Sequence, residues 1–339
     1  MLTIEQPAAR AIFQRQGYNP IPSLRPERGY ADIEIRLNLS AALRSDAWIR
    51  VQIIPCDPTA EIITVRRVMP AAGRHCITVR VPAGWHRLSA GAGDGTRLLA
   101  RTPTRLFGVG EVFLIAGQSY ADGCNDERLS IQDPRQRVSA YDLTRRRWQA
   151  ADDPQPGIRD GGTIWPAMAD DLLPYLQVPV GWANVAVAAT ASRQWMPGTT
   201  RFERMAGAGS ALHQFRAVLW QQGESDVIEQ TPADRYVQNL TTIRQALHGR
   251  WGFSPAWIPA KSTLHPTVYN NPAGESIIRS AIDRLWRTPG FLPGPDTDLL
   301  DGENRGGQQS LRHFSPIGQR RAGRMWAMTL WNHLQNARW

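Results

Sequence analysis

The hydrophobic pattern of the chain changes near Gly108, and this change most limits the folds open to it. Before that point, apolar and polar residues alternate in short segments separated by Pro and Gly, which is typical of half-buried β-strands. No convincing helical period occurs in this part. We therefore expect a small antiparallel β-sandwich over residues 1–108. Its predicted strands span residues 31–39, 48–54, 61–68 and 75–81.

After Gly108, apolar strands alternate with helical stretches. The first strand, residues 110–117, is bounded by glycines, and two of the helices begin with a capping residue followed by proline, at Thr231-Pro232 and Ser315-Pro316. This alternation predicts an α/β domain over residues 109–339, with a parallel sheet covered on both faces. Ligands of such sheets bind beyond the carboxyl ends of the strands. The later strands are predicted at residues 181–190, 215–222 and 256–263.

Composition and charge exclude several classes of protein. Hydrophobic residues make up 42% of the 339 residues and charged residues 20%, which excludes a disordered, collagen-like or coiled-coil chain. The net charge is +9, and all but one of the 39 basic residues are arginine, a bias that codon usage explains most simply. The basic runs at Arg145–Arg147 and Arg320–Arg321 are short and lack aromatic residues for base stacking. We therefore expect no binding to nucleic acid.

Cysteines and apolar segments bear on the cellular compartment. The three cysteines, Cys56, Cys76 and Cys124, are too few for a disulfide framework and too scattered for a zinc cage, although one Cys56–Cys76 bridge is compatible with the sequence. Residues 1–19 contain no signal-like apolar segment, and no apolar run reaches the roughly 18 residues that a membrane span needs. We expect a cytoplasmic protein that does not enter membranes.

Three polar segments follow predicted strands and are the candidates for chemistry. Ser119, in Gly117-Gln118-Ser119, comes directly after an apolar strand, so a tight turn would expose its hydroxyl as a nucleophile; the alternative is a serine that caps a helix. The absence of G-x-S-x-G argues against the ordinary α/β-hydrolase fold. Residues 220–226, WQQGESD, suit either a ligand pocket or a turn that caps its own strand. His313 precedes the last helix and has a catalytic meaning only as the base partner of Ser119.

Taken in order, four segments resemble the SGNH-type sialate O-acetylesterase and acetylxylan esterase family. They are GEVFLIAGQS, VPVGWANVAVAATASRQWMPG, WQQGESD and the HFS segment at 313–315, and the similarity covers about residues 105–330. The resemblance implies a flavodoxin-like three-layer SGNH hydrolase fold that follows the N-terminal sandwich. It also implies serine hydrolysis of O-acetyl esters on sugars, an acylated carbohydrate as the partner, and no metal or other cofactor.

The resemblance assigns roles to individual residues. Ser119 matches the nucleophile and His313 the general base. The oxyanion donors match the N–H of Ser119, an N–H in the turn at Ala189, and the side-chain amide of Gln222; losing one such donor costs on the order of 100- to 1,000-fold in turnover. Gln118, Tyr120 and Trp195 are candidates for substrate contact, and Trp195 has an equally good alternative as a core tryptophan. These seven positions form the predicted site, to which an acid that orients His313 is added below.

Three positions depart from the family pattern. Tyr120 replaces the usual asparagine after the nucleophile, Ala188-Ala189 replaces Gly-Gly, and Ser310 replaces the aspartate that orients the histidine. A triad without its carboxylate loses about 10,000-fold when the wrong histidine tautomer is favoured.

Other groups are available to orient His313. We rank Glu224 first; Asp298, Asp301 and a Ser119–His313 dyad held by a backbone carbonyl are the alternatives. Three functions stay open: an esterase, an O-acetyltransferase that uses the same site, and a carbohydrate-binding or assembly protein with a degenerate hydrolase domain. The sequence carries no signal for the sugar or for the oligomeric state.

Overall fold

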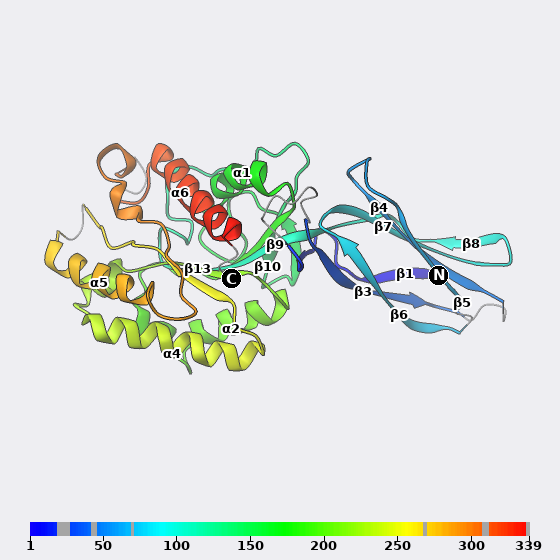
Figure 1. Cartoon of the computed structure of the whole chain (residues 1–339), viewed down its shortest axis with the longest axis horizontal. Helices are drawn as coiled ribbons and strands as arrows, with labels where there is room; N and C mark the ends of the chain where they lie inside the picture. Colours follow the sequence, from blue (N-terminus) through cyan, green and yellow to red (C-terminus); the bar gives the residue numbers. More distant parts are fainter. Residues whose placement is uncertain (19–27, 42–45, 69–70, 267–269, 307–311, 337–339) are drawn as a thin grey trace.

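The computed structural model describes residues 1–18, 28–41, 46–68, 71–266, 270–306 and 312–336. A β-rich part lies at one end of the molecule and an α/β part at the other (Figure 1). Strand β9 (Arg105–Gly117) runs through both, pairing with β7 (Gly84–Asp94) near its start and with strands of the α/β sheet near its end. The division predicted near residue 108 therefore falls inside one continuous strand.

The N-terminal part is the β-sandwich that the alternating pattern predicts. One sheet has the order β1-β3-β6, and the other continues from β9 through β7 and β4 to β5, with β8 paired to β7. In β3, every second residue from Ala31 to Leu39 is buried, and these side chains pack against inward residues of β4 and β7. The strands are β1 (Leu2–Gln6), β3 (Tyr30–Leu39), β4 (Trp48–Pro55), β5 (Ile63–Val68), β6 (Gly73–Pro82) and β8 (Arg97–Arg101); a short strand, β2 (Ile12–Gln14), pairs with β9.

The α/β part confirms the three-layer fold. Its parallel strands have the order β10-β12-β9-β13-β14, and β11 pairs antiparallel with β10 at the edge. Helices α1 and α6 cover one face, and α2, α4 and α5 cover the other (Figure 1). The strands are β10 (Val138–Asp142), β11 (Arg147–Ala150), β12 (Val180–Asn184), β13 (Ala217–Gln221) and β14 (Ala256–Pro259). The helices are α1 (Trp165–Leu176), α2 (Thr200–Leu212), α3 (Glu224–Ile228), α4 (Ala233–Trp251), α5 (Pro272–Leu285) and α6 (Pro316–Gln335), with 3₁₀ turns at Ser192–Trp195, Thr297–Leu299 and Gly302–Asn304.

The two helix starts predicted from the sequence differ in outcome. Ser315 is the N-cap of α6, and its hydroxyl accepts the N–H of Gly318 at 3.3 Å, as expected. In α4 the N-cap is Pro232 instead of Thr231, because Pro232 has an extended ψ of 146° and the helix begins one residue later.

Two other expectations can be compared with the structure. Cys56, Cys76 and Cys124 are all free, so Cys56 and Cys76 form no bridge. Among the described helices, none combines the length and the apolar character that crossing a membrane requires.

The turn after β9 is held at the carboxyl edge of the sheet. Gly117 has a φ of 136°, and a Cβ there would lie 2.1 Å from the carbonyl oxygen of Gln221, so only glycine fits. The N–H of Gln118 donates to that same oxygen at 3.0 Å, and the N–H of Val187 donates to the carbonyl of Gly117 at 3.0 Å. The loops that follow β9, β12 and β13 are therefore locked together where ligands of such sheets bind.

Candidate active site

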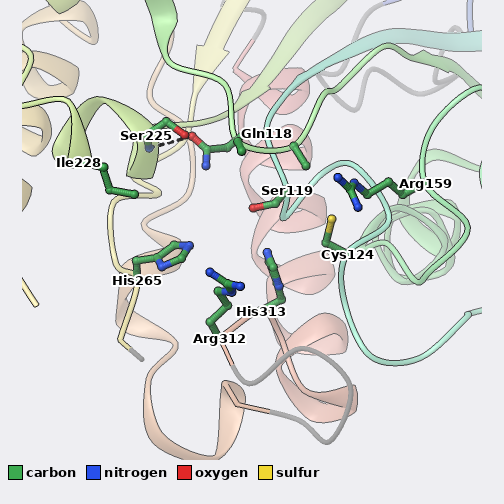
Figure 2. Close-up of a pocket in the computed structure, with 11 residues that line it drawn as sticks. Gln118, Ser119, Cys124, Arg159, Ser225, Ile228, His265, Arg312 and His313 are labelled. Carbon is green, nitrogen blue, oxygen red and sulfur yellow. Dashed lines mark hydrogen bonds between the residues drawn. The ribbon is translucent and has the colours of Figure 1, made fainter. Parts of the chain in front are cut away.

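A pocket of about 260 Å³ lies at this carboxyl edge. Loops that follow several parallel strands contribute to it, and the segment before α6 closes it on the side opposite Gln118 (Figure 2). Its lining comprises Gln118, Ser119, Cys124, Arg159, Ala188, Ala189, Ser225, Ile228, His265, Arg312 and His313.

The structure brings Ser119 and His313 into this pocket together. Ser119 is 6% exposed, and its hydroxyl oxygen faces the cavity, while a ring nitrogen of His313 points toward Ser119 (Figure 2). Within the described ranges no hydrogen bond joins the two side chains. Catalytic hydrogen bonds are often long before substrate binds, so the arrangement suits a nucleophile with a neighbouring base.

Two backbone N–H groups beside the pocket are without a partner among the residues that the structure describes. They belong to Ser119 and Ala189, whereas the N–H of Ala188 donates to the Asp122 carboxylate at 2.5 Å. Ala189 has a φ of 55°, in the left-handed region where alanine costs about 1 kcal/mol relative to glycine. The alanine thus keeps a conformation that glycine adopts more easily. The two free N–H groups are suitable donors for an oxyanion.

Of the two neighbouring glutamines, Gln118 rather than Gln222 presents its amide to the pocket. The amide nitrogen of Gln222 donates to Gln118 Oε1, the Thr190 carbonyl and Asp226 Oδ2, at 3.2, 3.1 and 2.6 Å, and Gln222 is fully buried. Gln118 Oε1 also accepts the N–H of Ser225 at 3.1 Å, which turns the Gln118 amide nitrogen toward the cavity (Figure 2). The Gln222 amide is therefore occupied by protein groups, which argues against its predicted oxyanion role, whereas the Gln118 amide nitrogen faces the cavity.

Two predicted substrate contacts lie below the pocket surface. The Tyr120 ring is fully buried 5.1 Å from the His313 ring, edge to face, and its hydroxyl donates to the carbonyls of Leu264 and Arg312 at 3.0 and 3.1 Å. Tyr120 thus supports His313 from behind. Trp195 is also fully buried, and its indole donates to Thr190 Oγ1 at 3.0 Å. The core alternative for Trp195 is the one that the structure shows.

Glu224 does not orient His313, contrary to our first choice. Its carboxylate is fully buried and accepts the Ser262 hydroxyl and the N–H of Gly223. Burial raises the pKa of Glu224 to about 8, against the opposing effect of the Ser262 hydrogen bond. Asp298 is also engaged elsewhere, with the N–H and hydroxyl of Thr263 and with Arg279. Ser310 lies outside the described residues. No carboxylate of the described residues bonds to His313, and its Nδ1 has no hydrogen-bond partner among them.

Replacing Glu224 by Gln tests this correction. We expect Glu224→Gln to keep the rate of ester hydrolysis within about threefold, whereas losing an orienting acid would cost about 10,000-fold. The folded state holds the carboxyl protonated up to about pH 8, and the unfolded chain ionises near 4.5, so Glu224 lowers stability progressively as pH rises through that window. The variant should therefore gain melting temperature over the wild type more at pH 8 than at pH 5. A collapse in rate with unchanged melting would contradict the correction.

The pocket is positively charged. Its lining includes Arg159 and Arg312 and, in the described part of the chain, no carboxylate. Arg159 lies 3.8 Å from the Asp122 carboxylate, and Arg312 forms no ion pair with any described residue. Burial and the charge of Arg312 lower the pKa of His313 to about 3 and that of His265 to about 4. Both imidazoles are therefore neutral at pH 7, which is the form a general base requires.

This electrostatic setting predicts an unusual pH profile. We expect kcat/KM for p-nitrophenyl acetate, a neutral substrate, to stay nearly constant from pH 7 to pH 5, because His313 keeps its neutral form. For a histidine with the ordinary pKa of about 6.5, the neutral fraction would be roughly 30-fold smaller at pH 5 than at pH 7. Arg312→Gln should move the acid limb toward higher pH by removing a nearby positive charge. A wild-type inflection near pH 6.5 would contradict the expectation.

Sequence reasoning missed several pocket residues. Arg312 is the most important, since with Arg159 it sets the charge of the cavity. His265 was also missed, and its ring lies 6.3 Å from the ring of His313. The adjacency of Arg312 to His313 was the only available signal, because loops have no hydrophobic period. Cys124 and Arg159 enter the lining from the loops after Ser119 and before α1.

Comparison with known proteins places this geometry in a family. No curated protein sequence matches the chain. Among solved structures, a carbohydrate acetylesterase from Xanthomonas citri is 15% identical with a TM-score of 0.58, covering 99% of this chain and 76% of that one. A protein from Arabidopsis thaliana is 19% identical with a TM-score of 0.52, covering 66% and 99%. These likenesses show a shared fold. Residues 109–331 match the family described as carbohydrate esterase, sialic acid-specific acetylesterase, and the chain belongs to this family of carboxylic ester hydrolases.

Proposed function

We propose that the protein removes O-acetyl groups from a carbohydrate through an acyl-serine intermediate, with Ser119 as nucleophile and His313 as base. The observation that carries this proposal is the placement of Ser119 beside His313 in one pocket, next to the free N–H groups of Ser119 and Ala189. Membership of a carbohydrate esterase family supports the reaction class.

The steps use groups that the pocket contains. Ser119 Oγ attacks the carbonyl carbon of the ester, and His313 accepts the hydroxyl proton. The N–H groups of Ser119 and Ala189 stabilise the negative oxygen of the tetrahedral intermediate, with the Gln118 amide beside them. His313 then gives this proton to the departing sugar oxygen, which leaves as a hydroxyl when the bond between it and the carbonyl carbon breaks. Water, deprotonated by His313, hydrolyses the acyl-serine and releases acetate.

The substrate that suits this pocket carries a negative charge. Arg312 is without an ion-pair partner within the described ranges, and the lining there offers no carboxylate that would repel an anion. A carboxylated sugar would pair with Arg312 and, by its charge, raise the pKa of His313 toward a range where imidazole is a stronger base. The family description names sialic acid, an acid of this kind.

Two measurements test the proposal. A fluorophosphonate probe should add its mass to Ser119 in the intact protein and leave Ser119→Ala unlabelled. Acetate release from an O-acetylated sialic acid should exceed release from an O-acetylated neutral xylan at equal acetyl concentration. Labelling elsewhere, or no labelling, would refute Ser119 as the nucleophile. Equal rates on the two sugars would refute the preference for an acidic substrate but would leave the role of Ser119 intact.

One observation favours a second function. An imidazole with a pKa of about 3 and no carboxylate bonded to it in the described structure is a weak base, which suits a carbohydrate-binding protein with a degenerate site. Tight binding of the acetylated acidic sugar without acetate release or probe labelling would establish that function. Product acetylated on an added sugar acceptor would instead indicate the O-acetyltransferase.

A further inference from the structure

The outer face of the larger sandwich sheet carries a row of arginines across neighbouring strands. Arg50 of β4 lies directly opposite Arg66 of β5 on one side and Gly91 of β7 on the other. Gly91 in turn lies opposite Arg101 of β8. Residues that face each other across antiparallel strands project from the same side of a sheet, and strands are about 4.8 Å apart. The row therefore places three guanidinium groups on one face within about 15 Å.

This face points away from the sandwich core. The alternate residues of β4, namely Ile49, Val51 and Ile53, belong to the buried core, so Arg50 and its row project outward. Arg66 and Arg101 are exposed, and Arg50 is partly exposed.

Two of the arginines, Arg50 and Arg66, are held against a tryptophan of the same face. Trp48, which precedes Arg50 on the same face, lies over Gly93, where an added Cβ would come 2.6 Å from the indole ring. The guanidinium carbon of Arg66 lies 4.6 Å from the centre of the Trp48 ring, and that of Arg50 lies 5.5 Å away. Trp48 Nε1 and Arg66 Nη2 both donate to the carbonyl of Gly95, at 2.9 and 3.1 Å. Such preorganisation lowers the entropy lost when a ligand binds.

The charges of this face are unbalanced. On the strands that form it, the outward positions within the described residues include no Asp or Glu, and Arg50, Arg66 and Arg101 form no ion pair with any described residue. Like charges directly opposite each other destabilise a sheet. A bound polyanion with regularly spaced negative groups would remove this cost.

The face also continues toward the hydrolase domain. Arg87 of β7 lies opposite Ile54 of β4. This pair is two residues along the strands from the pair of Gln52 and Ser89, so Arg87 projects from the same side of the sheet as Arg50. Arg87 also lines a groove of about 1200 Å³ between the sandwich and the α/β domain, together with Arg135 and Leu106. Arg87 thus extends the arginine row as far as this groove, which Asp57 and Glu61 also line.

We propose that this arginine face, defined by Arg50, Arg66, Arg87 and Arg101, is a docking surface for a carboxylated linear polysaccharide. Membership of a carbohydrate esterase family favours a polysaccharide over a nucleic acid as the occupant. The proposal does not depend on which residue is the nucleophile, since the face lies on the sandwich.

The test is a titration of the full chain with polygalacturonate, with dextran as the neutral polymer. We expect binding of polygalacturonate that weakens with added salt and no binding of dextran. Arg50→Gln with Arg66→Gln should lower the affinity on the order of tenfold, because charge-assisted hydrogen bonds to carboxylates are lost. Arg101 is not one of the arginines that stack on Trp48. Arg101→Gln should therefore lower the affinity for polygalacturonate about threefold and leave Arg50 and Arg66 stacked on Trp48.

The matched control is Arg36→Gln with Arg80→Gln, two exposed arginines on the other sheet of the sandwich. This double variant has the same change in net charge and should bind within about twofold of the wild type. Equal losses in the two double variants, or unchanged affinity in Arg50→Gln with Arg66→Gln, would overturn the proposal. Single-stranded DNA of the same total charge binding as tightly as polygalacturonate would also overturn it, by showing a surface that accepts any polyanion.

Discussion

Replacing Ser119 by alanine is expected to reduce the rate of p-nitrophenyl acetate hydrolysis by at least about 1,000-fold. The change removes the hydroxyl that faces the cavity beside His313 and leaves the N–H of residue 119, and with it the backbone at the pocket, in place. The rate that remains should be that of direct attack by water on the ester, with only the free N–H groups stabilising the transition state. Steady-state absorbance at a fixed enzyme concentration measures the effect, and thermal unfolding confirms that the variant is folded.

A second serine in the same pocket provides the control. Ser225 contributes its backbone N–H to Gln118 Oε1, and alanine retains that donor. We expect Ser225→Ala to hydrolyse p-nitrophenyl acetate within about threefold of the wild type. Wild-type activity in Ser119→Ala would remove Ser119 from the mechanism. Equal losses in both variants would mean that the pocket tolerates neither change and that the nucleophile lies elsewhere.

The fold could be predicted because its cores repeat with the periods of strands and helices. The alternation in residues 31–39 is the burial alternation of β3, and the apolar run after Gly110 becomes a strand buried on both faces, with Phe113 toward α1 and Leu114 toward α2. What the pattern did not show is that one strand serves two sheets. The hydrophobic pattern of the chain changes near Gly108, but β9 is largely buried on both sides of that residue, so the change did not show that the same strand continues from the sandwich into the α/β sheet.

Site residues could be predicted only where their position at a strand end or just before a helix brings them to the carboxyl edge of the sheet. Ser119 and His313 follow from strand ends and a helix start, and both reach the pocket. Among the polar residues after β13, local geometry decides which side chain faces a ligand. Gln222 turns toward Asp226, whereas Gln118, on the neighbouring loop, faces the cavity. For Glu224 the sequence offered a carboxylate near the right strand, but its direction, toward Ser262, depends on contacts between distant segments.

Replacing Glu111 by glutamine is expected to destabilise the protein by about 3–5 kcal/mol. Glu111, on β9, is fully buried and accepts hydrogen bonds from Arg15 at 2.6 Å, from Arg216 at 2.8 and 3.0 Å, and from Gln14 at 3.0 Å. Burial alone would raise the pKa of Glu111, but Arg216 and Arg15 outweigh it and hold that pKa at about 2. The variant leaves both arginines without their carboxylate, so urea-induced unfolding should occur at a much lower concentration.

The same cluster predicts a dependence on pH. Because the pKa of Glu111 falls from 4.5 in the unfolded chain to about 2 in the folded protein, its contribution is complete above pH 4.5 and is lost as pH falls through 2. The gap in urea midpoint between wild type and Glu111→Gln should therefore narrow as pH falls below 4.5. Asp160→Asn is the control, because its partner Arg128 and Asp160 itself are exposed and such pairs contribute at most about 1 kcal/mol. If Glu111→Gln and Asp160→Asn lowered the urea midpoint by the same small amount, Arg15 and Arg216 would have found other partners. The contact between the sandwich and the α/β sheet would then not depend on the Glu111 carboxylate.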